Sequence, residues 1–186
     1  MDAERTFHCE EHSIDEARPI RVIIIGAGPC GIISAIRLRQ RVKNVSIQVY
    51  EKNGDFGGTW YQHRYPGVAC DIPTLSYQLT FEPNREWTSF YPSGQEIGEY
   101  WKEVARKYEL HEPAKFQHQV KHAQWDRENG KWKFEVENLE SGEVTRDEAE
   151  FFFNCMGQFN NWEWPDIPNR ETFRGKIMHS AIWDET

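Results

Sequence analysis

The stretch from Ile20 to Gly31 reads IRVIIIGAGPCG, and it places an apolar, β-branched strand, a glycine turn and a helix start in direct succession. Its last six residues fit the pattern G-x-G-x-x-G. In this pattern Gly26 permits the tight turn, Gly28 lets the backbone approach a pyrophosphate, and Gly31 lets the helix pack closely on the strand. The free N–H groups and the positive end of the helix dipole then suit phosphate groups. The stretch therefore predicts a Rossmann-like unit that binds a dinucleotide.

An acidic residue follows at the place where such a unit needs one. The helix is expected from Cys30 to Val42, and a second strand from Val45 to Tyr50 delivers Glu51 at its carboxyl end. A carboxylate there accepts hydrogen bonds from the hydroxyls of a ribose. Lys52 is interpreted as a solvated charge. The plainer alternative is a glycine turn in an ordinary βαβ unit that binds nothing, but the order of strand, turn, helix and acidic strand end favours a dinucleotide.

Composition sets the class of protein and narrows its partners. The 186 residues suffice for one domain with a sizeable core. The formal net charge of -8 argues against nucleic acid or an anionic membrane surface as a partner. No apolar stretch approaches the ~20 residues that span a bilayer, and residues 1–18 are too charged for a signal peptide. We therefore expect a cytoplasmic protein.

Neither the cysteines nor the histidines indicate a metal site. The four cysteines are far apart and form no CxxC pair, so we expect reduced thiols rather than a disulfide framework or a zinc site. His118 and His122 fall in a predicted strand, where residues four apart are separated by ~13 Å. That separation is too large for both to bind one zinc ion.

A lead-in, a long loop region and a helix are predicted around the βαβ unit. Residues 1–19 carry many charges and little periodicity, which is typical of a flexible lead-in. Residues 52–95 are rich in glycine, proline and aromatic residues, and loops of that length are usually functional. An amphipathic helix is predicted from Ser93 to Leu110, with Ser93 as its N-cap and Glu96 completing a capping box.

The second half of the sequence predicts a β-meander. Alternating residues mark strands over Lys115–Trp125 and Lys131–Val136 and near Val144, with turn signals between them. A further, buried strand is predicted over Glu150–Cys155. The whole order predicts an α/β, Rossmann-like domain with a β-meander insertion.

Motifs in the loop region and near the end of the sequence resemble those of one known family. Residues 173–184 fit the pattern F-x-G-x-x-x-H-(S/T)-x-x-W-(D/P). The loop motifs are GGTW, RYPG and CDIP at residues 57–60, 64–67 and 70–73, followed by Tyr77 and Phe81. Together they resemble the FAD-domain motifs of Baeyer–Villiger and related class B flavin-dependent monooxygenases.

The resemblance implies a particular domain organisation. Residues 20–172 correspond to the FAD-binding domain of a two-dinucleotide-binding-domain flavoprotein, and residues 173–186 to a linker that leads toward an NADPH-binding domain. No second G-x-G-x-x-G motif follows Gly31, so we expect that domain to be lacking and the FAD domain to be incomplete relative to the family. Residues 154–157, NCMG, also depart from the family, which has a small residue and threonine or serine before the glycine. An incomplete domain exposes apolar surface, through which we expect association.

The resemblance also implies which residues hold FAD. Asp71 is the one catalytic candidate: it is expected at the edge of the flavin, where it contacts FAD and helps to order the nicotinamide and an arginine of the other domain. Tyr77 is implied to border the flavin, and Val120 to give a backbone contact to the adenine. The implied FAD-binding residues are Gly26, Gly28, Gly31, Glu51, Gly58, Thr59, Trp60, Asp71, Ile72, Tyr77 and Val120.

Several of these residues have alternative interpretations. Trp60 either stacks on the flavin or packs in the core. Asp71 either faces the flavin or forms an Asx turn ahead of Pro73. The resemblance implies that His179 couples NADPH binding to the flavin reaction without acting as an acid or base. Cys70 has no histidine or acid partner arguable from the sequence, so we do not interpret it as a nucleophile.

The resulting hypothesis is the FAD-binding part of an NADPH-dependent monooxygenase. In the complete family enzyme, NADPH reduces FAD, and oxygen is inserted beside a ketone carbonyl or transferred to a soft heteroatom of a small molecule. The alternative is a non-catalytic remnant or interaction module with weak or no nucleotide binding. A disulfide reductase is a third candidate, but it needs a redox cysteine pair in the loop after the first βαβ unit, and none is there. The sequence does not define the substrate.

Overall fold

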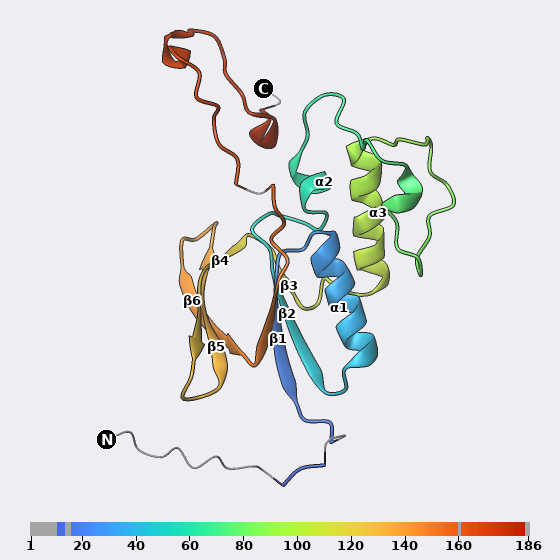
Figure 1. The fold of residues 1–186 in the computed structure, drawn as a ribbon, viewed down its shortest axis with the longest axis vertical. Coiled ribbons are helices and arrows are strands. Elements are labelled where there is room, and N and C mark those ends of the chain that lie inside the picture. The colour runs from blue at the N-terminus through green and yellow to red at the C-terminus, as the bar shows by residue number, and fades with distance from the viewer. Residues whose placement is uncertain (1–10, 14–15, 160, 185–186) are drawn as a thin grey trace.

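A four-stranded parallel sheet forms the centre of the computed structural model, which describes residues 11–13, 16–159 and 161–184. Its order is β3-β2-β1-β7 (Figure 1). The strands are β1 (Ile20–Ile25), β2 (Val45–Tyr50), β3 (Ala114–Lys115) and β7 (Phe151–Asn154), and helix α1 (Pro29–Arg41) connects β1 to β2. This arrangement confirms the predicted Rossmann-like α/β class. The predicted lead-in falls mostly outside the described residues.

Strand β1 has a hydrophobic core on each face. Because side chains alternate along a strand, Val22 and Ile24 pack toward the helices, whereas Ile23 and Ile25 pack toward the meander. All four are 7% exposed or less. The molecule therefore has three layers, with helices on one side of the sheet and the meander on the other (Figure 1).

Helix α3 (Gly94–Lys107) lies beside α1 on the same side of the sheet (Figure 1). The Ser93 hydroxyl accepts the Glu96 N–H at 3.2 Å, so the predicted N-cap is confirmed. The second half of the predicted capping box is wrong, because the Glu96 carboxylate accepts the N–H and hydroxyl of Thr88 instead. The helix also ends before Leu110, because Glu109 adopts a left-handed conformation with φ of 53°.

The long loop region contains two short helical segments. Helix α2 (Thr59–Gln62) follows the paired glycines Gly57 and Gly58, and the 3-10 turn η1 (Thr74–Ser76) follows Pro73. Both of these glycines have positive φ, a conformation that glycine adopts without steric penalty. The region therefore carries the sequence motifs on loops rather than on long elements.

The meander is a separate three-stranded antiparallel sheet of β4 (His118–Asp126), β5 (Lys131–Asn138) and β6 (Val144–Ala149). The prediction of one strand over Lys115–Trp125 was wrong, because the chain changes sheets there. Gln117 has φ of 56°, and its N–H donates to the carbonyl of Asn53. This left-handed residue ends β3 in the parallel sheet and starts β4 in the meander.

Strand β7 is an edge strand, and the prediction of a buried strand over Glu150–Cys155 was only partly right. Phe151 is 51% exposed, whereas Cys155, just after the strand, is 7% exposed. The reason is that β7 pairs with β1 alone among the described strands. The expected exposed apolar surface is thus present at this edge; whether anything associates through it stays a prediction.

The chain after β7 extends beyond the carboxyl end of the sheet and returns toward α2 (Figure 1). It contains the 3-10 turns η2 (Arg170–Thr172) and η3 (Ser180–Ile182). The His179 ring stacks on Trp162 at 4.9 Å between centroids, and the Gln62 side chain donates to the Ala181 carbonyl at 3.5 Å. Residues 173–184 therefore pack against Trp162, which precedes them in the chain, and against α2.

Candidate dinucleotide site

A cavity of about 390 Å³ opens at the carboxyl ends of β1, β2 and β7. Strands β2 and β7 lie on opposite sides of β1, so the strand order reverses direction at β1. In open α/β sheets, ligands bind at the carboxyl ends of the strands next to such a reversal. Six of the residues implied to bind FAD line this cavity: Gly26, Gly28, Glu51, Gly58, Thr59 and Val120.

Close backbone contacts build the glycine-rich end of the cavity. A Cβ atom on Gly31 would lie 2.0 Å from the carbonyl oxygen of Gly26. A Cβ atom on Gly26, which has φ of 103°, would lie 2.5 Å from the carbonyl oxygen of Cys155. A Cβ atom on Gly58 would lie 2.8 Å from the Cα atom of Gly28. This cavity wall is therefore main chain, and Gly31 packs behind it instead of lining it.

The start of α1 presents unpaired N–H groups to the same end. Gly28 is the N-cap and makes no side-chain capping bond, and Pro29 has no N–H to satisfy. The first intrahelical bond runs from the Ile32 N–H to the Gly28 carbonyl. The N–H groups of Cys30 and Gly31 precede this bond and so have no intrahelical acceptor. They are suited to an anion.

Glu51 brings a carboxylate to the cavity wall. It is 5% exposed, and its two oxygens accept the N–H groups of Ala27 at 2.7 Å and Asn53 at 2.8 Å. The first of these bonds joins the end of β2 to the glycine turn. A carboxylate has about four lone-pair sites, so roughly half remain for a ligand.

A second set of predicted residues does not line this cavity. The Trp60 ring meets the Tyr77 ring edge to face at 5.3 Å between centroids and packs against Gly94, while the Trp60 carbonyl lies against Gly98 of α3, so the core-packing interpretation holds in part. Ile72 is 46% exposed. We call Trp60, Asp71, Ile72 and Tyr77 the loop group.

Asp71 of the loop group is exposed and near Tyr77. Burial, followed by the negative charge of Asp71, raises the pKa of the Tyr77 hydroxyl. Within the described residues the Asp71 carboxylate makes no hydrogen bond, so the alternative of an Asx turn before Pro73 is not formed. The structure thus leaves this carboxylate available.

Sequence reasoning missed several residues of the cavity. Lys52 lines it, although it was interpreted only as a solvated charge. So does Tyr50, whose hydroxyl donates to Asp147 at 2.7 Å; burial raises the pKa of that hydroxyl. So does His63, whose pKa is lowered by burial and by His179. Adjacency to Glu51 was the available signal for Lys52 and Tyr50; the sequence had none for His63.

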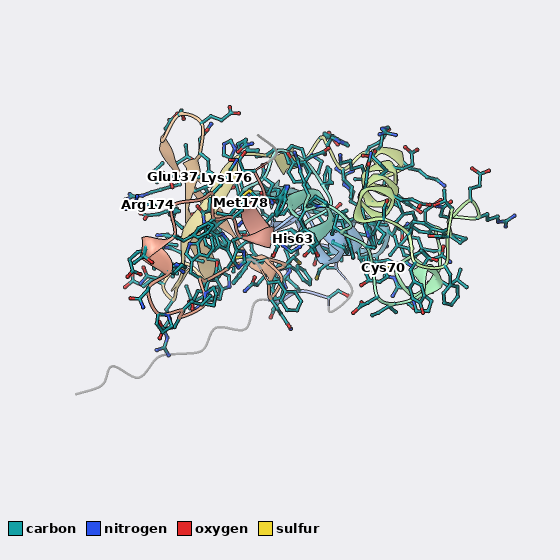
Figure 2. The ribbon with its side chains drawn as sticks, turned by 90° about the horizontal axis from the view of Figure 1, so that it is seen from above. His63, Cys70, Glu137, Arg174, Lys176 and Met178 are labelled. Atoms are coloured by element: carbon teal, nitrogen blue, oxygen red, sulfur yellow. The ribbon has the colours of Figure 1, made fainter. Side chains whose placement is uncertain are left out.

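Cys70 does not line the cavity. Viewed from above the sheet, Figure 2 shows His63 near the middle of the molecule and Cys70 toward the α3 side, with Arg174, Lys176 and Met178 on the opposite side. Cys70 is 6% exposed, and its thiol points to the carbonyl of Pro92 at 3.8 Å. Its position is that of a packed core residue.

The fold is Rossmann-like and its cavity is a candidate dinucleotide site; the family model described as "NAD(P)-binding Rossmann-like domain" matches residues 24–92. An FAD-binding monooxygenase of Aspergillus terreus, tazF, is 41% identical over 169 residues, which are 90% of this chain and 30% of that protein. A Baeyer-Villiger monooxygenase of Streptomyces coelicolor is 37% identical over 165 residues, again 30% of that protein and 89% of this chain. The solved polycyclic ketone monooxygenase of Thermothelomyces thermophila matches with a TM-score of 0.78 and 31% identity, over 94% of this chain and 29% of that one.

Over about 90% of its length the chain is similar to FAD-binding monooxygenases, among them a Baeyer-Villiger monooxygenase. It spans about 30% of the length of the curated relatives that it matches. None of its described helices has the length and apolar character needed to cross a membrane.

Proposed function

We propose that this chain is the FAD-binding part of an NADPH-dependent flavin monooxygenase, and that its cavity holds the adenosine diphosphate half of FAD. The supporting observation is the Glu51 carboxylate, which faces the cavity beside the glycine turn. Two of its lone-pair sites are taken by backbone N–H groups, and the rest match the two hydroxyls of a ribose.

The residues of the cavity fit this half of the cofactor. The pyrophosphate would lie against the main chain of Gly28 and the N–H groups of Cys30 and Gly31, where any Cβ atom on Gly58 would collide with Gly28. Val120 also lines the cavity, in agreement with an adenine contact. At about 390 Å³ the cavity lies at the small end of the ~300–1,000 Å³ typical of ligand sites, which suits part of FAD.

The flavin half of FAD would extend from the cavity toward the loop group. There Tyr77 and the Trp60 ring would border it, and the unbonded Asp71 carboxylate would orient a partner cation at its edge. When bound, FAD supplies the oxygen-transfer chemistry of the enzyme. This chain's own contribution is to bind and orient the cofactor. Ketones and soft heteroatoms are the proposed substrate class, and a cytoplasmic location stays a prediction.

Flavin retention tests the proposed function. The purified chain is incubated with FAD, desalted and examined for a visible flavin band. We expect retained flavin, with affinity reduced about tenfold to hundredfold in Glu51→Gln, because one charge-assisted set of hydrogen bonds is lost. The matched control is Glu128→Gln, which changes an exposed acid on the turn between β4 and β5.

Two results would contradict the proposal. Wild-type protein that retains no flavin, while remaining folded by circular dichroism, would favour the remnant. Equal affinity in wild type and Glu51→Gln would remove Glu51 from the site.

Adding NADPH under air is expected to leave the flavin oxidised, because the sequence contains no second G-x-G-x-x-G motif.

An interaction module is the second candidate function, and the exposed rings of the loop region favour it. Phe90 is 59% exposed and Tyr91 52%, and the Phe90 carbonyl accepts the N–H of Thr74, which brings them near Leu75, 67% exposed. Exposed apolar side chains that cluster in this way mark binding surfaces.

A further inference from the structure

Cys30 and Cys155 are 125 positions apart in the sequence but line the same cavity. Cys30 is exposed in the first turn of α1, and Cys155 follows β7 and is 7% exposed. Both are free thiols. The proposed binding of FAD uses the backbone around them but assigns neither sulfur a role.

The contacts of α1 bring the two sulfurs together. The Sγ atom of Cys155 lies 3.9 Å from the Oγ atom of Ser34. Ser34 is one helical turn beyond Cys30, so the two residues share a face of α1, and Cys155 packs on that face. Burial, followed by the interaction with the Cys30 thiol, raises the pKa of the Cys155 thiol to about 12. The Cys30 thiol is thus exposed, and the buried Cys155 thiol that interacts with it is protonated at neutral pH.

We propose that Cys30 and Cys155 form a redox-sensitive dithiol, which a hydroperoxide converts to a disulfide that narrows the phosphate end of the cavity. The dithiol itself stands on the contacts above. Its effect on ligand binding rests on the proposed function, because it concerns the same phosphate end.

The oxidation proceeds in two balanced steps. The exposed Cys30 sulfur attacks the peroxide, the O–O bond breaks, and Cys30 becomes a sulfenic acid while one water, or an alcohol from an organic hydroperoxide, leaves. The Cys155 sulfur then attacks the sulfenic sulfur, the S–S bond forms, and a second water leaves with the Cys155 proton. Two thiols supply two electrons, and one hydroperoxide accepts them.

The disulfide would act on the cavity because its two walls are already in contact. An S–S bond of ~2.05 Å brings the sulfurs much closer than non-bonded contact allows. It would pull the first turn of α1 and the segment after β7 together on either side of Gly26. The main chain is already tightly packed there, since a Cβ atom added to Gly26 would lie 2.5 Å from the Cys155 carbonyl oxygen. The N–H groups of Cys30 and Gly31 would be displaced from a bound pyrophosphate.

Peptide mapping tests the dithiol without any ligand. The reduced full chain is treated with hydrogen peroxide, its remaining thiols are alkylated, and it is digested with trypsin without reductant. We expect residues 22–37 and 147–170 to appear as one linked species, lighter by two hydrogens than the two peptides together, while Cys70 is alkylated. Cys9→Ser should leave this link unchanged, and Cys155→Ser should abolish it. A sulfinic acid on Cys30 without the link, or links mainly to Cys9 or Cys70, would overturn the dithiol.

FAD retention by the two redox forms tests the effect on the cavity. We expect the oxidised chain to bind FAD about tenfold or more weakly than the reduced chain, with recovery after dithiothreitol. Cys155→Ser should bind FAD equally before and after peroxide. Equal binding by both forms of the linked wild type would overturn the narrowing. If the reduced chain binds no FAD, the proposed function and the narrowing fail, while peptide mapping still decides the dithiol.

Discussion

The cavity end of the sheet and the loop group were both implied to hold one cofactor, but the structure builds them differently. At the cavity end, Gly26, Gly31 and Glu51 are held by main-chain contacts and buried hydrogen bonds. In the loop group, Asp71 and Ile72 are exposed, and only Trp60 and Tyr77 pack on each other. A binding site made of main-chain atoms is shaped by the folding of the domain itself. A binding site made of exposed side chains takes its shape only when a ligand or another part of a protein contacts those side chains.

The largest expected effect falls on the cavity end. Gly31→Ala would place a methyl group 2.0 Å from the Gly26 carbonyl oxygen, in backbone that cannot yield. We expect a loss of about 3 kcal/mol or more in the free energy of unfolding, measured by urea denaturation. Gly130→Ala is the control, since its φ of 63° gives strain with nothing within 4 Å. Gly130→Ala should lose only about 1–2 kcal/mol in the free energy of unfolding. Equal losses in the two variants would show that the close packing around Gly31 does not contribute to stability.

The ion pair that supports the end of β2 comes next. The Asp147 carboxylate accepts hydrogen bonds from Arg21 and Tyr50, both at 2.7 Å. We expect Asp147→Asn to lose about 1–3 kcal/mol in the free energy of unfolding at neutral pH. An unchanged value would mean that the cavity end does not depend on this support. Glu143→Gln, which changes an exposed acid just before β6, the strand that carries Asp147, is the control.

The same residue gives a pH dependence with a definite sign. Burial raises the pKa of Asp147, but the hydrogen bonds from Arg21 and Tyr50 outweigh it, so the pKa lies below its ordinary value. The stabilisation is therefore present above the unfolded pKa of ~3.9 and is lost as pH falls through the folded pKa. The difference in stability between wild type and Asp147→Asn should shrink as pH falls from 7 toward 3 in urea titrations. A constant difference would contradict this sign.

The N-cap that follows the loop region has a smaller expected effect. Ser93→Ala removes the hydroxyl that accepts the Glu96 N–H, so we expect a loss of about 1 kcal/mol in thermal or urea unfolding. Ser93→Asp should retain most of the stability, because its carboxylate can cap the same N–H. A full loss in both variants would point to another role for this position.

The smallest effect is expected at the loop group itself. Asp71→Asn should change the free energy of unfolding by less than about 0.5 kcal/mol, because the carboxylate is exposed and makes no hydrogen bond in the described part of the chain. Its effect on FAD retention by this chain should also be much smaller than that of Glu51→Gln. A loss as large as that of Glu51→Gln would erase the contrast between the two regions.

The βαβ unit was predictable because its signals are local. The apolar run predicted the strand from Val45 to Tyr50 with its observed bounds. The glycine turn predicted a helix start at Cys30, one residue after the observed start of α1 at Pro29. The Ser93 cap likewise depends on residues three positions apart. Such features are fixed by short-range sterics and hydrogen bonds, which a sequence states directly.

The remaining features depend on contacts that are distant in sequence. Gln117 is left-handed where the chain passes between sheets, although it is not a glycine, and no local pattern marks it. The Glu96 carboxylate turns to Thr88, eight positions away. Cys30 and Cys155 line the same cavity although they are distant in sequence, because β7 pairs with β1. The roles of the loop group in the candidate site came from resemblance, and the structure leaves them as proposals.

Strand β1 has a further consequence for how the molecule opens. Since its alternate side chains belong to the core under the helices and to the core under the meander, neither core can separate from the sheet without exposing part of this strand. The two layers should therefore unfold cooperatively as one foldon, and the amide protons of Val22 to Ile25 should exchange with solvent only when the whole domain unfolds.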